Sequence, residues 1–296
     1  VAYGTAKKSA FTGSAATIKS EKITSRQTSN VTNALTGQVA GVQTTSNSGQ
    51  PGKDAEVRIR GIGSISASNK PLYVVDGVPY DGEISAISTS DIESMTVLKD
   101  AASNALYGAR GANGVILITT KKGKAGVQRI TYSSGLTVDH AISLPEFQNS
   151  YGAKAGSSWG EKENVKDYDN AGNWFSNGVT AINSVSVMTG NEKLQTYFSY
   201  ANTTAKGIVD SNKLRKHNLT LRESASLFND RLKLDANANL MVQTIKNSPT
   251  SGGIYLNPLV DVYGFPRGQD LSEYATNFEK FDENRNMPVQ SWFTTP

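Results

Sequence analysis

The sequence predicts an α+β domain followed by the first strands of a transmembrane antiparallel β-barrel. Three observations support this prediction. Helical spacing and short apolar runs, separated by Gly and Ser clusters, occur only before about residue 126. Beyond that point, polar and apolar residues alternate over stretches longer than the usual strand of about five or six residues. Short turns there alternate with longer loops, as in outer-membrane barrels.

The first domain is expected to span residues 29–126. Apolar residues at spacings of three and four predict a helix over residues 29–41, and these are Val31, Ala34, Leu35 and Val39. Ser29 or Thr28 can cap its start, and Gly41 ends it. Residues 1–28 are rich in Ser, Thr and Lys and show no periodicity, so we expect an extended or mobile arm.

Strands are expected at residues 57–60, 72–75, 92–99 and 115–120. Asp76 and Gly77 follow the second of these strands and predict a hairpin turn, to which we assign no chemistry. Pro79 lacks a backbone donor, so the returning strand is not expected in the interior of the sheet.

A second, short helix is expected from Asp100 to Leu106. Gly108, Gly111 and Gly114 follow it, and they precede a strand instead of opening a helix, so they do not fit a dinucleotide-binding loop. We expect these glycines to end the helix and to permit positive φ in tight turns.

Five alternating strands are expected in residues 127–296. They lie at residues 130–138, 182–189, 194–204, 214–226 and 232–243. In the last of them, Leu232, Leu234 and the apolar residues that follow at every second position would face lipid. Lys233, Asp235 and Asn237 would face an aqueous lumen. Five strands do not close a barrel, so we expect them to be the front portion of a larger one.

Composition excludes several other classes of protein. The 296 residues contain no Cys and only two His, which rules out a disulfide scaffold and argues against a metal site or bound cofactor. The 30 Lys and Arg residues nearly balance 26 Asp and Glu residues and are dispersed, so nucleic-acid binding is not expected. No nucleophile motif or paired acid and base is evident, so we do not expect an enzyme.

Two stretches carry a resemblance to a known family. Residues 72–80, LYVVDGVPY, and residues 91–123, which include DIESMTVLKDAAS and GARGANGVILITTKKG, resemble the plug of the SusC/RagA class of TonB-dependent outer-membrane transporters. VRIRG at residues 57–61, the opening AYGTAKK and NPLVDVYGFPRG at residues 257–268 are similar to the same class.

The resemblance implies a plug domain inside a 22-stranded barrel in the bacterial outer membrane. It implies import of a large nutrient, either a glycan or a peptide, with a SusD-like surface lipoprotein as a lid. The TonB, ExbB and ExbD complex would supply energy by pulling on a TonB box, of which Val1, Ala2 and Tyr3 would be the remnant. The alternative is a structural or binding subunit of the same fold that transports nothing.

The resemblance also suggests contacts between plug and barrel. Plug arginines in the wider superfamily face carboxylates of the barrel wall, and the candidates here are Arg58, Arg60, Lys99 and Arg110. The alternative is that they are solvated side chains worth about 0 to 1 kcal/mol each.

Aromatic residues of the two long loops are the candidate contacts for substrate or lid. They are Trp159, Trp174, Tyr255, Tyr263, Phe265 and Trp292. Flat rings stack on sugars and pack against peptide side chains equally well. The alternative is that they anchor their own loops or form an interfacial girdle.

Overall fold

A computed structural model describes residues 15–25, 28, 30–46, 50–61, 68–99, 107–154, 158–247 and 258–291. The chain divides into two compact units. The first consists of residues 1–138, 179–207 and 212–246, and the second of residues 139–178, 208–211 and 247–296. Each unit is described by itself.

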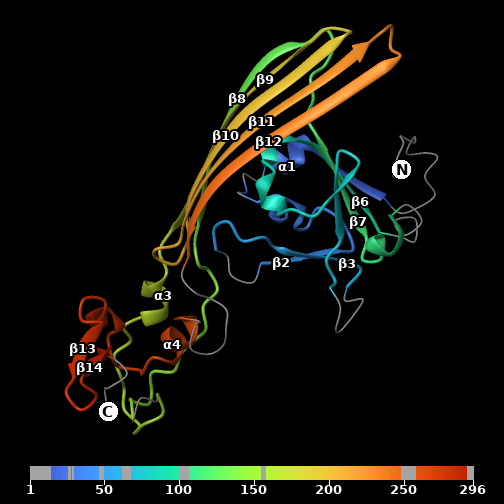
Figure 1. Cartoon of the computed structure of the whole chain (residues 1–296). Coiled ribbons are helices and arrows are strands. Elements are labelled where there is room, and N and C mark those ends of the chain that lie inside the picture. The colour runs from blue at the N-terminus through green and yellow to red at the C-terminus, as the bar shows by residue number, and fades with distance from the viewer. Residues whose placement is uncertain are drawn as a thin grey trace. The chain divides into compact units, whose positions relative to one another are not determined.

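The first unit contains the α+β domain, which we call the plug domain (Figure 1). Its elements are β1 (Ala15–Lys19), α1 (Ser20–Thr24), β2 (Val42–Thr45), β3 (Glu56–Ile59), β4 (Leu72–Val75), β5 (Val78–Tyr80), β6 (Ile92–Leu98) and β7 (Val115–Thr120), with short 3-10 helices at Asn33–Leu35, Ile84–Ala86, Thr89–Asp91 and Gly108–Gly111. One sheet has the order β1-β6-β7-β4-β5, and β2 pairs with β3 separately. All four strands predicted for this domain are therefore confirmed.

The core of the plug domain is apolar and lies beneath its sheet. Ile92, Met95 and Val97 of β6 and Ile116 and Ile118 of β7 are buried in it. The β4–β5 hairpin is confirmed, with φ of 48° at Asp76 and 89° at Gly77, and Pro79 lies in β5 at the edge of the sheet. An edge strand tolerates the missing donor of proline.

Two predictions for this domain were wrong in extent. Residues 15–24 are not an arm, because β1 pairs with β6 and Ile23 of α1 is fully buried. The helix expected over residues 29–41 is reduced to one 3-10 turn at Asn33–Leu35. Asn30 explains this, because its side chain bonds the Thr32 backbone and the Lys53 carbonyl and so competes with helical hydrogen bonding. The four apolar residues of the predicted helix are nevertheless all buried.

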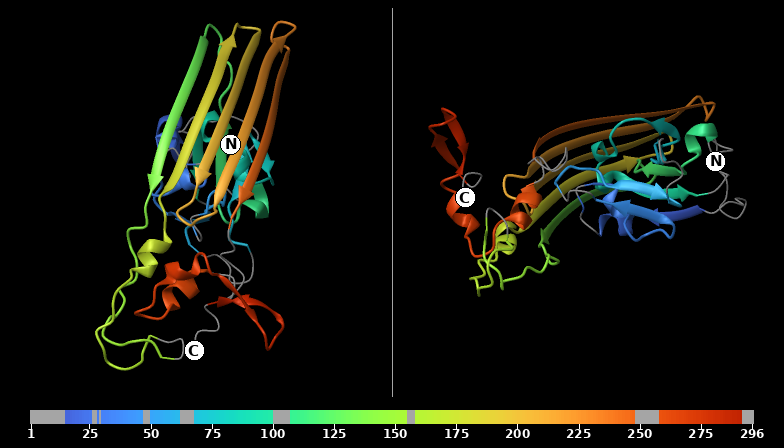
Figure 2. Two further views of the ribbon diagram at one scale, coloured as in Figure 1. Left: turned by 90° about the vertical axis from the view of Figure 1, so that its left-hand side faces the viewer. Right: turned by 90° about the horizontal axis from the view of Figure 1, so that it is seen from below.

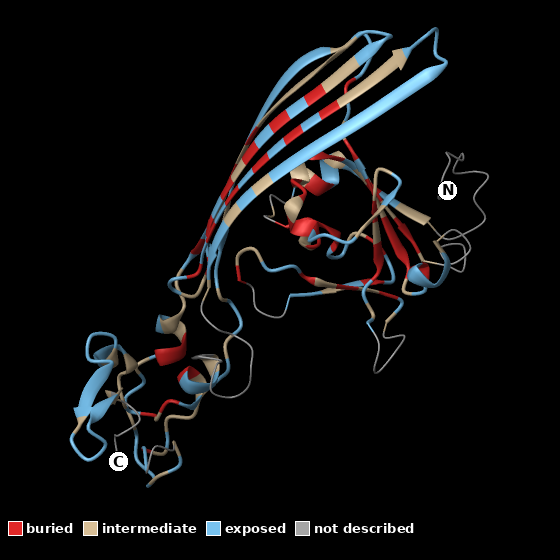
Figure 3. Cartoon of the chain, in the orientation of Figure 1, coloured by how far each residue is buried: buried red, intermediate tan, exposed pale blue. Residues whose placement is uncertain are grey.

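The first unit also contains a curved five-stranded antiparallel sheet, which we call the wall (Figure 2). It has the order β12-β11-β10-β9-β8, and the strands are β8 (Gln128–Asp139), β9 (Gly178–Gly190), β10 (Leu194–Lys206), β11 (Lys213–Leu227) and β12 (Leu232–Lys246). Each predicted strand is confirmed and is longer than its predicted range. Buried and exposed residues alternate along β10 and β11 (Figure 3), because one face of the wall meets the plug domain.

The opposite face of the wall carries many exposed apolar side chains, among them Ile130, Leu136, Leu221, Leu240 and Val242. Polar residues such as Asn202 and His217 lie on the same face. Exposed apolar side chains of this kind are typical of strands that contact lipid. Among the described residues, no helix has both the length and the apolar character that crossing a membrane requires.

The second unit contains α3 (Asn170–Trp174), α4 (Pro258–Gly264), a 3-10 helix at Leu271–Tyr274 and the hairpin of β13 (Glu279–Asp282) and β14 (Met287–Gln290). Arg267 is buried and joins segments that are distant in sequence. Its guanidinium donates to the Gln148 carbonyl at 3.1 Å and to the Asn149 side chain at 2.7 Å, and it pairs with Asp167 at 2.9 Å. The two long loops are thus held together by one arginine.

Candidate functional site

The candidate site is the polar interface between the plug domain and the wall. It begins with the inward face of β11, where Lys216, Asn218, Thr220 and Arg222 stand at every second position and are all buried. Polar side chains are seldom buried unless they are hydrogen-bonded. Here each of the four donates to a group of the plug domain.

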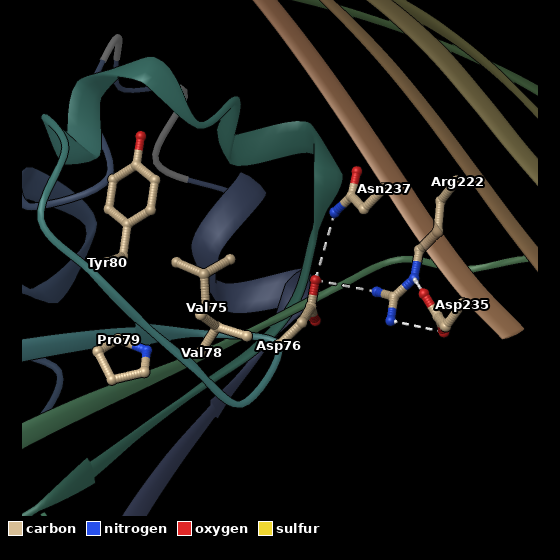
Figure 4. A pocket seen from close by; sticks show the side chains of 8 residues that line it. All are labelled: Val75, Asp76, Val78, Pro79, Tyr80, Arg222, Asp235 and Asn237. Atoms are coloured by element: carbon tan, nitrogen blue, oxygen red, sulfur yellow. Dashed lines mark hydrogen bonds and ion pairs between the residues drawn. The ribbon is translucent and has the colours of Figure 1, made fainter.

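The largest cluster of charge lies at the β4–β5 turn (Figure 4). Asp76 Oδ2 lies 3.0 Å from Arg222 Nη1, and both side chains are nearly buried. Arg222 also donates to Asp235 of β12, from Nε at 3.0 Å and from another nitrogen, Nη2, at 3.1 Å. Asn237 Nδ2 completes the cluster at 3.4 Å from Asp76. One guanidinium therefore bridges a carboxylate of the plug domain and a carboxylate of the wall.

Local structure explains why Asp76 is available for this contact. The left-handed backbone at Asp76 and Gly77 reverses the chain directly after β4, so the carboxylate leaves the edge of the sheet at the turn. Asp76 then accepts from the Thr120 backbone at 2.9 Å and from its hydroxyl at 2.6 Å. Thr120 ends β7, which pairs with β4 in parallel. The plug domain itself therefore holds the Asp76 carboxylate in the position where it contacts Arg222.

A second cluster surrounds Asp91, which is buried at the end of a 3-10 helix. Its two carboxylate oxygens accept from Tyr197 Oη of β10 at 2.9 Å and from Thr220 Oγ1 of β11 at 2.8 Å. Asn239 of β12 donates to the same Thr220 hydroxyl at 2.8 Å. Side chains of three adjacent wall strands thus hydrogen-bond to Asp91, two directly and Asn239 through Thr220.

The third group of contacts uses backbone acceptors of the plug domain. Lys216 Nζ donates to the Ser85 carbonyl at 3.1 Å, and Asn218 Nδ2 donates to the Ala86 carbonyl at 2.6 Å. Ser85 and Ala86 belong to the 3-10 helix at Ile84–Ala86, whose last carbonyls have no partner within the helix. The wall supplies the missing donors.

A pocket of about 430 Å³ adjoins the Asp76 cluster. Its lining combines Val75, Val78, Pro79 and Tyr80 of the plug hairpin with the charged residues of the wall (Figure 4). Burial raises the pKa of Tyr80, and nearby Glu83 raises it further, so its phenol is neutral at physiological pH. The described residues include no group of three or more His, Asp or Glu side chains placed to hold a metal ion.

The structure gives three of the predicted plug–barrel contacts other partners. Arg58 pairs with Glu56 at 2.8 Å, Lys99 donates to the Ala40 carbonyl at 2.6 Å, and Arg110 pairs with Asp81. All of these partners belong to the plug domain. Each of the three cations thus has a partner in its own domain, and a contact with carboxylates of the barrel wall stays a prediction. Arg60 lies after β3 in a left-handed conformation, with φ of 61°.

Four of the five predicted turn residues, Asp76, Gly77, Gly108 and Gly114, have positive φ. Gly108 and Gly114 have φ of 63° and 87°, as expected, whereas Gly111 is a buried member of the 3-10 helix. The helix expected over residues 100–106 lies outside the described residues. Asp76, predicted to have only a turn role, is corrected to a contact residue, because its carboxylate holds both Thr120 and Arg222.

The candidate aromatics differ in exposure. Trp159 is 68% exposed beside Tyr151 and so can meet a ligand. Phe265 is buried against Tyr274, and Tyr263 lies 6.1 Å from Phe147 between ring centroids, so these two contribute to packing within their own unit. Trp174 ends α3 and is partly buried. Tyr255, Trp292 and the TonB-box remnant Val1, Ala2 and Tyr3 lie outside the described residues.

Sequence reasoning missed most wall partners. Arg222, Thr220 and Tyr197 lie in strands whose alternation was recognised, but only Lys233, Asp235 and Asn237 were assigned to the inner face. Charged or polar residues at every second position of a neighbouring strand could have identified the remaining wall partners, because such residues would also face the lumen. Arg222 and Lys216 are such residues in β11.

Three comparisons with known proteins are consistent with this architecture. The family model described as TonB-dependent receptor plug domain matches residues 7–115. The chain is 34% identical to the TonB-dependent receptor SusC of Bacteroides thetaiotaomicron over 282 residues, which is 89% of this chain and 28% of SusC. It is 46% identical to the TonB-dependent receptor P26 of Formosa agariphila over 125 residues, 42% of this chain and 13% of that receptor.

Among solved structures, the chain is similar to the RagAB peptide importer in its 'open-open' state. The TM-score is 0.71 at 28% identity, and the match covers 85% of this chain and 33% of that chain. The chain thus spans about a third or less of the relatives that it matches.

Proposed function

Because the chain belongs to the SusC/RagA class of TonB-dependent receptors, which lie in the bacterial outer membrane, we propose that it imports a large nutrient across that membrane. The plug domain closes the lumen, and its displacement from the wall opens a path. The steps are mechanical and electrostatic, and no covalent bond is made or broken.

The observation that supports gating best is the chemistry of the plug–wall contact. The inward residues of β11 meet the plug domain through hydrogen bonds and ion pairs. When such groups separate in a hydrated lumen, water can replace each lost partner, so a neutral hydrogen bond contributes only about 0.5–1.5 kcal/mol net and one to a charged group about 1.5–3 kcal/mol. Separating an apolar interface would instead expose apolar surface to water, and no new hydrogen bond would compensate for it. A polar contact can therefore hold the plug domain and still release it under tension.

The proposed partners follow from the class. The TonB, ExbB and ExbD complex would pull on the N-terminal part of the receptor, and a SusD-like surface lipoprotein would cover the outer side. The cargo would be an oligosaccharide or an oligopeptide, and the similarity to the RagAB peptide importer supports a peptide. The exposed ring of Trp159 is a candidate contact for cargo or lid.

The test uses the full-length receptor in its own bacterium. Cells with the receptor gene deleted should lose uptake of one labelled oligopeptide or oligosaccharide pool, and a plasmid copy should restore it. Deleting TonB should abolish the same uptake. If the receptor binds cargo at the surface while uptake is equal with and without the gene, the protein is a binding or structural subunit and the import proposal fails.

A further inference from the structure

Two carboxylates of the Asp76 cluster share one arginine, and Lys122 of the plug domain also interacts electrostatically with Asp235. Asp76 of the plug domain and Asp235 of the wall both contact the Arg222 guanidinium (Figure 4). Asp235 is about half exposed, whereas Arg222 and Asp76 are nearly buried. The second carboxylate is therefore not needed to neutralise a buried charge while the plug domain is in place.

The nitrogens of Arg222 are divided between the two domains. Nε and Nη2 donate to the two oxygens of Asp235, which is the strong side-by-side arrangement of arginine and carboxylate. Nη1 alone serves the plug domain, where it contacts Asp76 and the Thr120 hydroxyl at 2.7 Å. Ser224 also donates to Asp235 at 3.1 Å and so holds that carboxylate within the wall.

We propose that Asp235 is a positioning residue that keeps Arg222 in the wall and eases the release of the plug domain. This inference rests on the proposed gating function. Asp235 competes with Asp76 for one guanidinium and repels it as a like charge. When the plug domain leaves, Arg222 keeps two hydrogen bonds and a counter-charge, so separation does not leave an unpaired cation in the wall.

The proposal predicts opposite effects for two equivalent substitutions. Asp76→Asn removes the charge that crosses the interface, so the plug domain should separate faster. Asp235→Asn removes the competitor and the repulsion, so Asp76 should hold Arg222 more tightly and separation should slow. A general loss of structure would accelerate separation in both variants.

The experiment measures separation directly in the full-length receptor, freed of any other Cys. Ser85→Cys places a reporter thiol at a buried position of the interface, where Lys216 contacts the Ser85 carbonyl. Labelling by a maleimide then reports how often plug and wall part. Asp235→Asn should slow labelling roughly three- to tenfold, and Asp76→Asn should speed it by a similar factor. Asp235→Glu should restore the native rate.

Asp81→Asn is the matched control, because Asp81 is an exposed plug carboxylate paired with Arg110 and should leave the rate unchanged. An unchanged or faster rate in Asp235→Asn would overturn the proposal. Uptake by intact cells is measured in parallel, and Asp235→Asn should lower its initial rate. If the native receptor imports nothing, the import proposal fails while the labelling rates still decide the role of Asp235.

Discussion

Removing the hydroxyl that Tyr197 donates to Asp91 should loosen the plug domain. The Tyr197→Phe change keeps the ring, which is 1% exposed, and deletes only the donor at 2.9 Å from a buried carboxylate. A hydrogen bond to a charged group is worth about 1.5–3 kcal/mol. The open fraction of the interface should therefore rise roughly 10- to 100-fold. Adding Thr220→Val removes the other wall donor, and the two effects need not add because they share one acceptor.

Hydrogen exchange of the full-length receptor measures this open fraction in peptides that cover residues 84–98. Tyr200→Phe is the matched control, since Tyr200 lies in the same strand on the opposite face and its hydroxyl meets His217 at 2.8 Å. Exchange in the plug domain should accelerate in Tyr197→Phe and stay unchanged in Tyr200→Phe. Equal exchange in the two variants would refute the view that the Asp91 contacts hold the plug domain.

Three further predictions concern charge, backbone and pH. Arg222→Met leaves two carboxylates without their cation and should weaken the association of the plug domain with the wall by about 3 kcal/mol. Arg110→Met, at an exposed position, should cost only about 0–1 kcal/mol. The same exchange experiment measures both. Gly114→Ala should destabilise the plug domain more than Gly108→Ala, by urea unfolding, because an added Cβ would clash only at position 114 and φ is unfavourable at both. Hydrogen bonds from the Asp169 backbone and the Asn149 side chain lower the pKa of Asp167 below its ordinary value of 3.8. The contribution of Asp167 to the stability of its unit is therefore complete above pH 3.8 and is lost as the pH falls through the lowered pKa. Hydrogen exchange near Gln148 should show this step, and Asp167→Asn should abolish it.

Much of the fold could be predicted because the relevant signals are local. Alternation with a period of two fixed the five wall strands, and the Asp76-Gly77 pair fixed the hairpin at β4 and β5. The buried face of residues 31–39 was also correct, since burial depends on spacing whether or not a regular helix forms. The helix itself did not form, because Asn30 offered the backbone other partners.

The candidate site depended on contacts that no local pattern encodes. Asp76 was predicted only as a turn residue, since its partner Arg222 lies in β11, the fourth strand of the wall, and meets it through the packing of two domains. The cations selected by resemblance, Arg58 and Arg110, instead found acceptors close to them in their own domain. Register decides such pairings, and a shift of one residue would turn Arg222 to the lipid-facing side.

Whether import requires the plug domain to move away from this wall can be measured with a reversible cross-link. Asp76→Cys and Asn237→Cys replace two side chains that touch across the interface at 3.4 Å, and a short thiol-cleavable reagent would join them in the full-length receptor. Uptake should stop when the link forms and return after reduction, while the same treatment should leave uptake by each single variant at that variant's own untreated level. Undiminished uptake through fully cross-linked receptors would contradict gating at this interface.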